Sequence, residues 1–280
     1  MTRLFVVWSG FALAVAVAQQ PPISNASLRQ ASASNGLQAA IQSAASAAGG
    51  PAWIGYAVPA IPGEHNNGCC WSNDGRGCGL EGRRVGSVDG SPATPIRLEG
   101  PSHVVILLRF EQGAAEKLRV YSPDCPLDAG GLPFYWLADV KAGESVALLA
   151  ARLEQRQRTD SVVHAIAMHA GAEAEAMLVK LSGSTQIEPT RKSALFWLAA
   201  SRGKAGYDIV SRAAREDPSD KVREHAVFAL TQSKQPDAIP AIIRIAQEDK
   251  SPHVRKQAIF WLGRSKDARA LGFLEQVLSR

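Results

Sequence analysis

The sequence predicts an α+β protein of several parts: a small β-rich module stapled by disulfides, followed by an α-solenoid of about four helix pairs. Three observations lead to this fold class. The C-terminal half repeats with a period of 32 residues. Residues 51–141 contain short β-branched and aromatic runs separated by Gly and Pro, which is typical of strands and turns. All 4 cysteines fall in the N-terminal half.

The first 18 residues have the pattern of a cleaved secretory signal. Arg3 precedes an apolar run from Leu4 to Ala18, and Ala16-Val17-Ala18 forms a small-residue cleavage site. The run holds about 15 residues, fewer than the ~20 that a membrane-spanning helix requires. We therefore expect an exported protein, periplasmic or extracellular, with no membrane span after cleavage. An uncleaved N-terminal anchor is the alternative.

The net charge of +5 is carried by the C-terminal half of the chain. Residues 19–150 hold 9 Lys and Arg against 11 Asp and Glu, whereas residues 151–280 hold 21 against 15. An exported protein rarely meets nucleic acid, so we expect no nucleic-acid partner. The basicity favours solubility or a partner protein that is itself acidic.

Three segments of the C-terminal half align without a gap, beginning at Thr190, Val222 and Val254. A weaker copy begins at Val162. A second apolar position follows each repeated alanine by sixteen residues, so each unit is expected to form two helices. The aligned residues are Arg191, Arg223 and Arg255; Ala194, Ala226 and Ala258; Phe196, Phe228 and Phe260; and Leu198, Leu230 and Leu262.

This repeat resembles the HEAT family, in the short form that is also named after phycobilisome lyases. The matching pattern is D-x-V-R-x-x-A-x-x-A-L, clearest from Asp220 to Leu230, and the resemblance covers roughly Asp160 to Arg280. It implies a right-handed α-solenoid that binds other proteins, and it does not imply lyase chemistry. It also implies that the second helix of each pair lines a concave face.

Three groups of residues in the repeats are candidates for a role. The repeated arginines, with Asp220 as cap and partner, are expected to form a structural ladder with the loops between repeats. The repeated phenylalanines, with Trp197 and Trp261 beside two of them, form either an exposed ridge that docks a partner or a row buried between helices. Arg212 and Arg244 occupy equivalent positions on second helices and are a further candidate for partner binding.

The remaining segments divide the chain further. We expect residues 19–50 to be an Ala- and Ser-rich linker and residues 51–141 to be a mostly antiparallel β module. The sequence EQGAAE between Phe110 and Lys117 predicts a hairpin turn. Residues 142–280 are predicted to form the solenoid, beginning with a helix that covers the open end of the first repeat.

The cysteines are Cys69, Cys70, Cys78 and Cys125. An even number in an exported chain indicates disulfides, and a bond between the adjacent Cys69 and Cys70 would strain the backbone. We therefore expect one of these two to pair with Cys125 and the other with Cys78. A zinc site that adds His65 stays open, although the spacing lacks the paired C-x2-C of zinc ribbons.

The sequence favours a protein that binds or scaffolds other proteins and is not an enzyme. It contains no Gly-rich phosphate loop, Ser-centred elbow or paired-carboxylate signature, so we predict no catalytic residue, metal or cofactor. One alternative is an enzyme or metal-binding protein whose site lies near His65 and the Cys69–Cys78 loop. Another is a module that senses a ligand outside the cytoplasm and relays it through the solenoid.

Signal removal after Ala18 is the first testable expectation. The intact mass of the exported protein should correspond to a chain that begins at Gln19, because Ala16-Val17-Ala18 is the cleavage site. A mature N-terminus that still contains Leu4 to Ala18 would contradict this and indicate an anchored protein.

Overall fold

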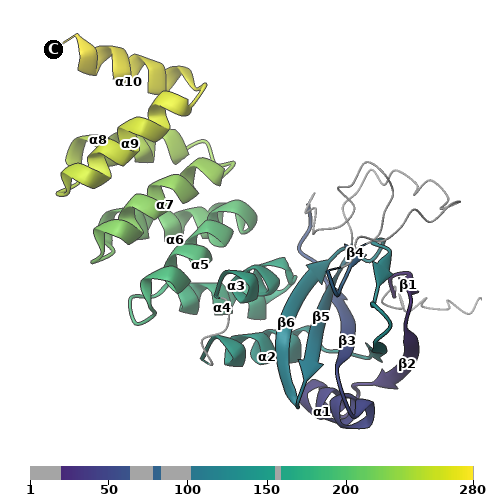
Figure 1. Cartoon of the computed structure of the whole chain (residues 1–280). Coiled ribbons are helices and arrows are strands. Elements are labelled where there is room, and N and C mark those ends of the chain that lie inside the picture. Colours follow the sequence, from purple (N-terminus) through teal and green to yellow (C-terminus); the bar gives the residue numbers. More distant parts are fainter. Residues whose placement is uncertain (1–19, 64–77, 83–101, 155–158, 280) are drawn as a thin grey trace, which may run out of the picture.

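The computed structural model describes residues 20–63, 78–82, 102–154 and 159–279, in which a β module and a helical solenoid lie end to end (Figure 1). The β module contains β1 (Ile23–Ser24), β2 (Ser27–Ser32), α1 (Leu37–Ala48), β3 (Ala52–Pro59), β4 (Cys78–Gly79), β5 (His103–Glu111), β6 (Ala114–Tyr121), β7 (Leu127–Asp128) and β8 (Pro133–Ala138).

The main sheet has five strands in the order β2-β8-β3-β5-β6. β3, β5 and β6 pair antiparallel, and the turn at Gln112 and Gly113, both at positive φ, closes the predicted hairpin. β2 and β3 both run parallel to β8, which lies between them. The expectation of a mostly antiparallel module is therefore wrong for one side of the sheet. There, α1 provides the crossover that parallel strands require.

The central strands are buried on both faces of the sheet. On β3, Ile54 and Tyr56 face the helices, whereas Trp53 faces the small sheet β1-β7-β4. Gly55 sits on the same face as Trp53, where a Cβ atom would lie 2.6 Å from Leu107 Cδ2. This two-sided cover explains why β3, β5 and β8 are almost continuous apolar runs.

The sequence expectation of a linker at residues 19–50 is wrong for the described part, 20–50, because it forms β1, β2 and α1. Leu37, Ile41 and Ala44 lie on one face of α1 and are buried against the sheet. Gly36 offers no side chain to cap α1, and Glu144 Oε2 instead accepts a hydrogen bond from Leu37 N–H at 2.7 Å. The segment is therefore an integral part of the module.

The solenoid begins after α2 (Ala142–Glu154), which packs on the first helix pair. A first layer is formed by α3, α5, α7 and α9, and a second layer by α4, α6, α8 and α10 (Figure 1). This arrangement agrees with the predicted HEAT-like solenoid. The bounds are α3 (Thr159–Met168), α4 (Ala172–Ser182), α5 (Glu188–Ser201), α6 (Gly203–Glu216), α7 (Asp220–Gln232), α8 (Ala238–Glu248), α9 (Pro252–Arg264) and α10 (Ala268–Leu278).

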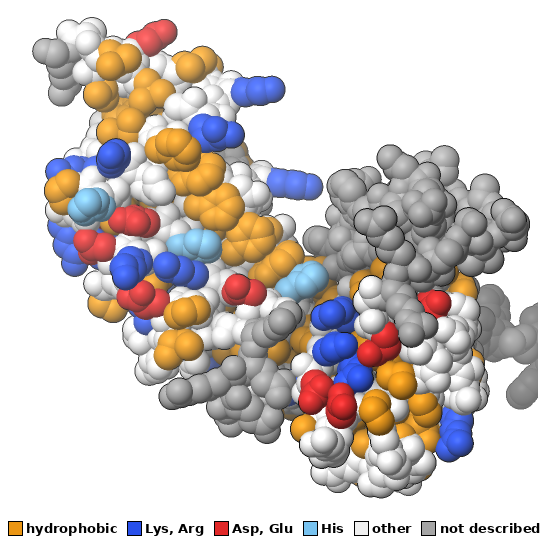
Figure 2. All heavy atoms as spheres, in the orientation of Figure 1, with side chains coloured by type: hydrophobic (Ala, Val, Ile, Leu, Met, Phe, Trp, Pro, Cys, Tyr) orange, Lys and Arg blue, Asp and Glu red, His pale blue; other side chains and the backbone are white. Residues whose placement is uncertain are grey.

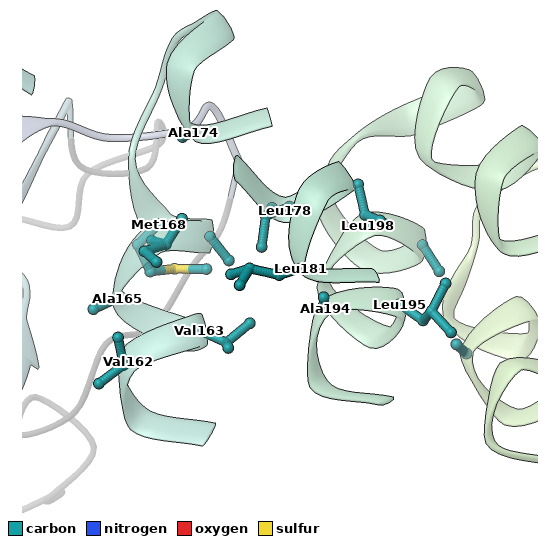
Figure 3. Close-up of a cluster of buried hydrophobic side chains, with 14 of the residues drawn as sticks. Val162, Val163, Ala165, Met168, Ala174, Leu178, Leu181, Ala194, Leu195 and Leu198 are labelled. Atoms are coloured by element: carbon teal, nitrogen blue, oxygen red, sulfur yellow. The ribbon is translucent and has the colours of Figure 1, made fainter. Parts of the chain in front are cut away.

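The repeated small and apolar residues form the core of the solenoid. Ala194, Ala226 and Ala258 are fully buried, as are the leucines four residues after them. In the first two pairs, Leu178 and Leu181 of α4 lie between side chains of α3 and α5 (Figure 3). A helix pair alone would expose this apolar face, so the stacked pairs depend on one another.

The sheet and the solenoid share one hydrophobic core. The buried cluster runs without interruption from the helix-facing side of the sheet through α2 and α3 to α10. Backbone hydrogen bonds reinforce the junction: Ile61 N–H donates to Met168 O at 3.0 Å, and Ala170 N–H donates to Pro59 O at 2.8 Å. The solenoid therefore extends directly from the sheet.

A buried chain of hydrogen bonds crosses this junction. His169 Nδ1 lies 2.7 Å from Ala165 O, so it carries the proton, and Nε2 accepts from Ser145 Oγ at 2.8 Å. Ser145 in turn accepts from Tyr56 Oη at 2.9 Å. All three side chains are fully buried. Burial lowers the pKa of His169 to about 4 and raises the pKa of Tyr56.

No disulfide joins Cys78 to Cys125, the two cysteines that lie within the described residues. Cys69 and Cys70 lie outside them, so the predicted pairing stays untested there. Cys78 is disulfide-bonded, and its backbone N–H donates to Pro126 O at 2.8 Å. Cys125 is buried in the same apolar cluster as Leu127 and Trp136.

The buried histidine predicts a pH dependence of stability. The pKa of His169 falls from an ordinary 6.5 to about 4 in the folded state. Between these pH values the unfolded chain therefore binds a proton at His169 and the folded chain does not. Stability should therefore decline as pH falls from 6.5 to about 4, by about 3 kcal/mol from this group. Denaturant unfolding across this range measures the decline.

The matched control is His169→Gln, which cannot take up a proton. Burial also lowers the pKa of His225, so some slope should remain in the variant. Equal slopes for the wild type and His169→Gln would contradict the assignment.

Candidate protein-binding surface

A continuous row of aromatic rings follows the first layer of the solenoid. We call Phe196, Trp197, Phe228, Phe260 and Trp261 the aromatic stripe. Phe196 lies 5.8 Å from Phe228 between ring centroids, and Phe228 lies 4.9 Å from Trp261. Within α5 and α9 each Phe meets its Trp edge-on. Figure 2 shows an oblique band of hydrophobic side chains along the solenoid.

The sequence left two alternatives for these rings, an exposed ridge or a row buried between helices, and the structure shows features of both. Phe196, Trp197, Phe228 and Trp261 are half-buried, and Phe260 is 50% exposed. Each ring rests on its neighbours and leaves part of its surface to solvent. The rings touch because the 32-residue period puts them at the same position on adjacent first helices. Packed helices lie about 8–10 Å apart, which is close enough for rings at equivalent positions to meet.

Two histidines extend this surface, and the sequence reasoning did not single them out. His164 of α3 stacks on Trp197 with centroids 4.8 Å apart, and His225 of α7 meets Phe228 edge-on at 5.6 Å. Burial, followed by the charge of Lys192, lowers the pKa of His225. Spacing in the sequence could have identified His225 as part of this surface, because His225 and Phe228 are three residues apart and therefore share a helix face.

A hollow of about 660 Å³ opens beside the stripe between α3, α5 and α7. Its wall is apolar at Phe196 and Trp197, acidic at Asp160 and Glu188, and basic at Lys192. A hydrogen bond from Ser219 Oγ at 2.6 Å holds the pKa of Glu188 below its ordinary value. The hollow can therefore receive an apolar side chain and bond polar groups around it. Ser161, His164, Pro189, Ser193 and His225 complete its lining.

The repeated arginines point into the loops between helix pairs. Arg191 pairs with Asp217 at 3.0 Å, and both side chains are buried. Arg223 is fully buried and pairs with Asp249 at 3.0 Å. The carbonyl of Asp217 accepts from Arg223 at 2.8 Å, and the carbonyl of Asp249 accepts from Arg255 at 2.7 Å. Each aspartate thus binds two successive arginines.

Asp220 pairs with Arg223 at 2.8 Å but does not cap α7, contrary to the expectation. The cap is Ser219, whose Oγ accepts from Val222 N–H, and Asp220 is the first residue of the helix. The sequence E-D-P-S-D contains both Ser219 and Asp220 as possible helix caps, and a serine cap is as favourable as an aspartate cap.

Arg212 and Arg244 lie on α6 and α8, in the second layer. Both are exposed, at equivalent positions of successive repeats. They belong to a different layer from the stripe, so they form a separate candidate surface.

The alternative site in the N-terminal module lies largely outside the described residues, since His65, Cys69 and Cys70 are not among them. Over 20–63, 78–82, 102–154 and 159–279, no three His, Cys, Asp or Glu side chains converge as metal ligands. In the same ranges, no helix has the length and apolar character needed to cross a bilayer.

Replacing a central ring of the stripe measures how far the repeats depend on it. Phe228→Glu removes ring contacts with Phe196 and Trp261 and should lower the free energy of unfolding by about 1–3 kcal/mol. Leu230→Ala, at a fully buried position, should cost about 2–5 kcal/mol. Denaturant unfolding compares the two. A larger loss for Phe228→Glu than for Leu230→Ala would show that the stripe is core and not surface.

Comparison with known proteins agrees with the repeat pattern in part of the chain. No family model matches the N-terminal half. The search of curated proteins finds no match to the chain. Residues 208–280 match the family model of HEAT repeats, so the C-terminal part of the chain carries HEAT repeats, as the sequence pattern predicts.

Proposed function

We propose that this is an exported, non-catalytic protein whose HEAT-type solenoid binds or scaffolds another protein. HEAT repeats generally mediate protein–protein interaction, which supports this function at the level of the repeat. The observation that carries the proposal is the aromatic stripe. Its rings follow one another without a break across α5, α7 and α9, and each keeps part of its surface open to solvent.

The chemistry of the stripe fits a protein partner. Aromatic residues are enriched at interfaces because their large, stiff side chains bury much area for little lost entropy. The hollow at the α3 end of the stripe adds a place for one anchoring side chain, with Lys192, Asp160 and Glu188 available to polar groups around it. We infer a partner segment that lies along the stripe and inserts an apolar residue into the hollow.

The excess of Lys and Arg in residues 151–280 supports a partner that carries acidic groups, through attraction at longer range. Near the stripe this charge includes Arg264, whose guanidinium lies 5.9 Å from the centre of the Phe260 ring. The signal at residues 1–18 supports export, so the partner is expected outside the cytoplasm.

A pull-down of the mature protein from the native envelope tests the proposal. Phe260→Glu should leave the fold intact, because the ring is 50% exposed, and should reduce recovery of the partner about tenfold or more. Val179→Glu, at a 40% exposed apolar position on α4, is the matched control and should change nothing. If recovery survives Phe260→Glu but is lost in Arg212→Glu/Arg244→Glu, the second layer is the binding surface and the proposed site is wrong.

A further inference from the structure

The rings of the aromatic stripe recur once per helix, in a row that crosses the first layer of the solenoid. α5, α7 and α9 pack side by side in that layer, and packed helices lie about 8–10 Å apart. A polyproline II segment has three residues per turn and rises about 3.1 Å per residue, so the same side of it returns about every 9 Å. Each turn of such a segment can therefore meet the ring of one helix.

The stripe is narrow, because polar side chains border it along each helix. Residues four positions before and after the phenylalanines lie one turn away on the same helix face. Five of these six residues are polar: Lys192, Glu224, Gln232, Lys256 and Arg264. Figure 2 shows Lys and Arg side chains on both sides of the hydrophobic band. A partner helix, about 10–12 Å across, would press its apolar face onto this border, whereas a thin extended segment can follow the rings alone.

The hollow lies where a small side chain is placed between two large ones. The residue before the repeated alanine is Ser193 in α5, but it is a histidine in both neighbouring first helices, His164 in α3 and His225 in α7. All three residues line the hollow. The ring of His164 is stacked on Trp197 beside it, with centroids 4.8 Å apart. An apolar residue at the end of a bound segment can therefore enter between rings.

The two ends of the stripe differ in charge. At the α9 end, the Arg264 guanidinium lies 5.9 Å from the centre of the last phenylalanine ring, and the exposed Lys256 is one turn before that ring. At the α3 end, Asp160 and Glu188 outnumber Lys192 in the lining of the hollow. Carboxylates of a bound segment are therefore favoured at the α9 end and disfavoured at the hollow.

We propose that the stripe binds an extended, proline-rich segment of a partner protein, with an apolar residue in the hollow and acidic residues at the α9 end. Proline-rich segments dock on aromatic-lined surfaces and are already extended before binding, so they lose little entropy. The two helix steps from α5 to α9 cover about 16–20 Å, or about six residues of such a segment, and the step to the hollow adds about three. The proposal rests on the function proposed above and names the class of segment that the stripe takes.

Fluorescence anisotropy of labelled peptides with the full chain tests this proposal. The probe contains one leucine, nine prolines and two glutamates, and it is made in both chain directions, with the leucine first or last. We expect saturable binding of at least one of the two. A peptide in which Gly and Ser replace the prolines keeps the charge but is flexible, and it should bind about tenfold more weakly or not at all.

Variants of the protein locate the bound peptide. Phe260→Ser should weaken binding about tenfold, whereas Val179→Ser, at an exposed apolar position on α4, should leave it unchanged. Arg264→Gln should weaken binding of the acidic peptide about two- to fivefold and should not affect a peptide that lacks the glutamates. Arg212→Gln, at an exposed position on α6, is the matched control for loss of a cation and should have no effect.

The proposal is overturned if neither proline peptide binds, if the Gly and Ser peptide binds equally well, or if Phe260→Ser leaves the affinity unchanged. Tighter binding of an acidic amphipathic helical peptide, lost with Phe260→Ser, also overturns it, because the partner segment would then be helical. The pull-down separates these results from the proposed function. If partner recovery depends on Phe260 while the proline peptides do not bind, the stripe is the binding surface and only the class of segment is wrong.

Discussion

The buried ion pair between Arg223 and Asp249 is the contact on which the order of the solenoid depends. Arg223 is fully buried, and it reaches carboxylates of Asp249 and Asp220 and the carbonyl of Asp217. A buried guanidinium without such partners would cost several kcal/mol. Because Asp249 precedes the next repeat, the pair can form only when that repeat stands in one orientation. The ladder therefore fixes how each helix pair follows the previous one.

The aromatic stripe follows from this fixed orientation. Rings that are 32 residues apart in the chain meet in space only if successive first helices keep the same angle and height. Phe196 and Phe228 stack with an interplanar angle of 17°, which agrees with such a regular step. The first helix beside the aromatic stripe is α3, which carries His164. The shared core and backbone hydrogen bonds at Ile61 and Pro59 hold α3 and the residues after it to the β module, and this fixes where the stripe begins. The sheet thereby positions the end of the stripe that carries the hollow.

The sequence predicted the solenoid well because its determinants are local and repeated. Arg, Ala, Phe and Leu recur at one spacing, which gave the helix pairs, the buried alanines and the row of rings. The N-terminal module was predicted less well because its determinants are long-range. Nothing local to Pro133–Ala138 shows that this strand inserts between β2 and β3. Likewise, His169 meets Ser145 and Tyr56 only through the tertiary fold, although all three lie in recognisable elements.

A double-mutant cycle on Arg223→Met and Asp249→Leu tests the central claim most directly. The free energy of unfolding is measured for the wild type, both single variants and the double variant. Each single change should cost about 3–5 kcal/mol, because it leaves a buried charge without its main partner. The double variant should lose at least about 2 kcal/mol less than the sum of the two, which is the coupling that a register-setting ion pair requires. Losses that add to within about 0.5 kcal/mol would contradict the account, because the two residues would then act independently.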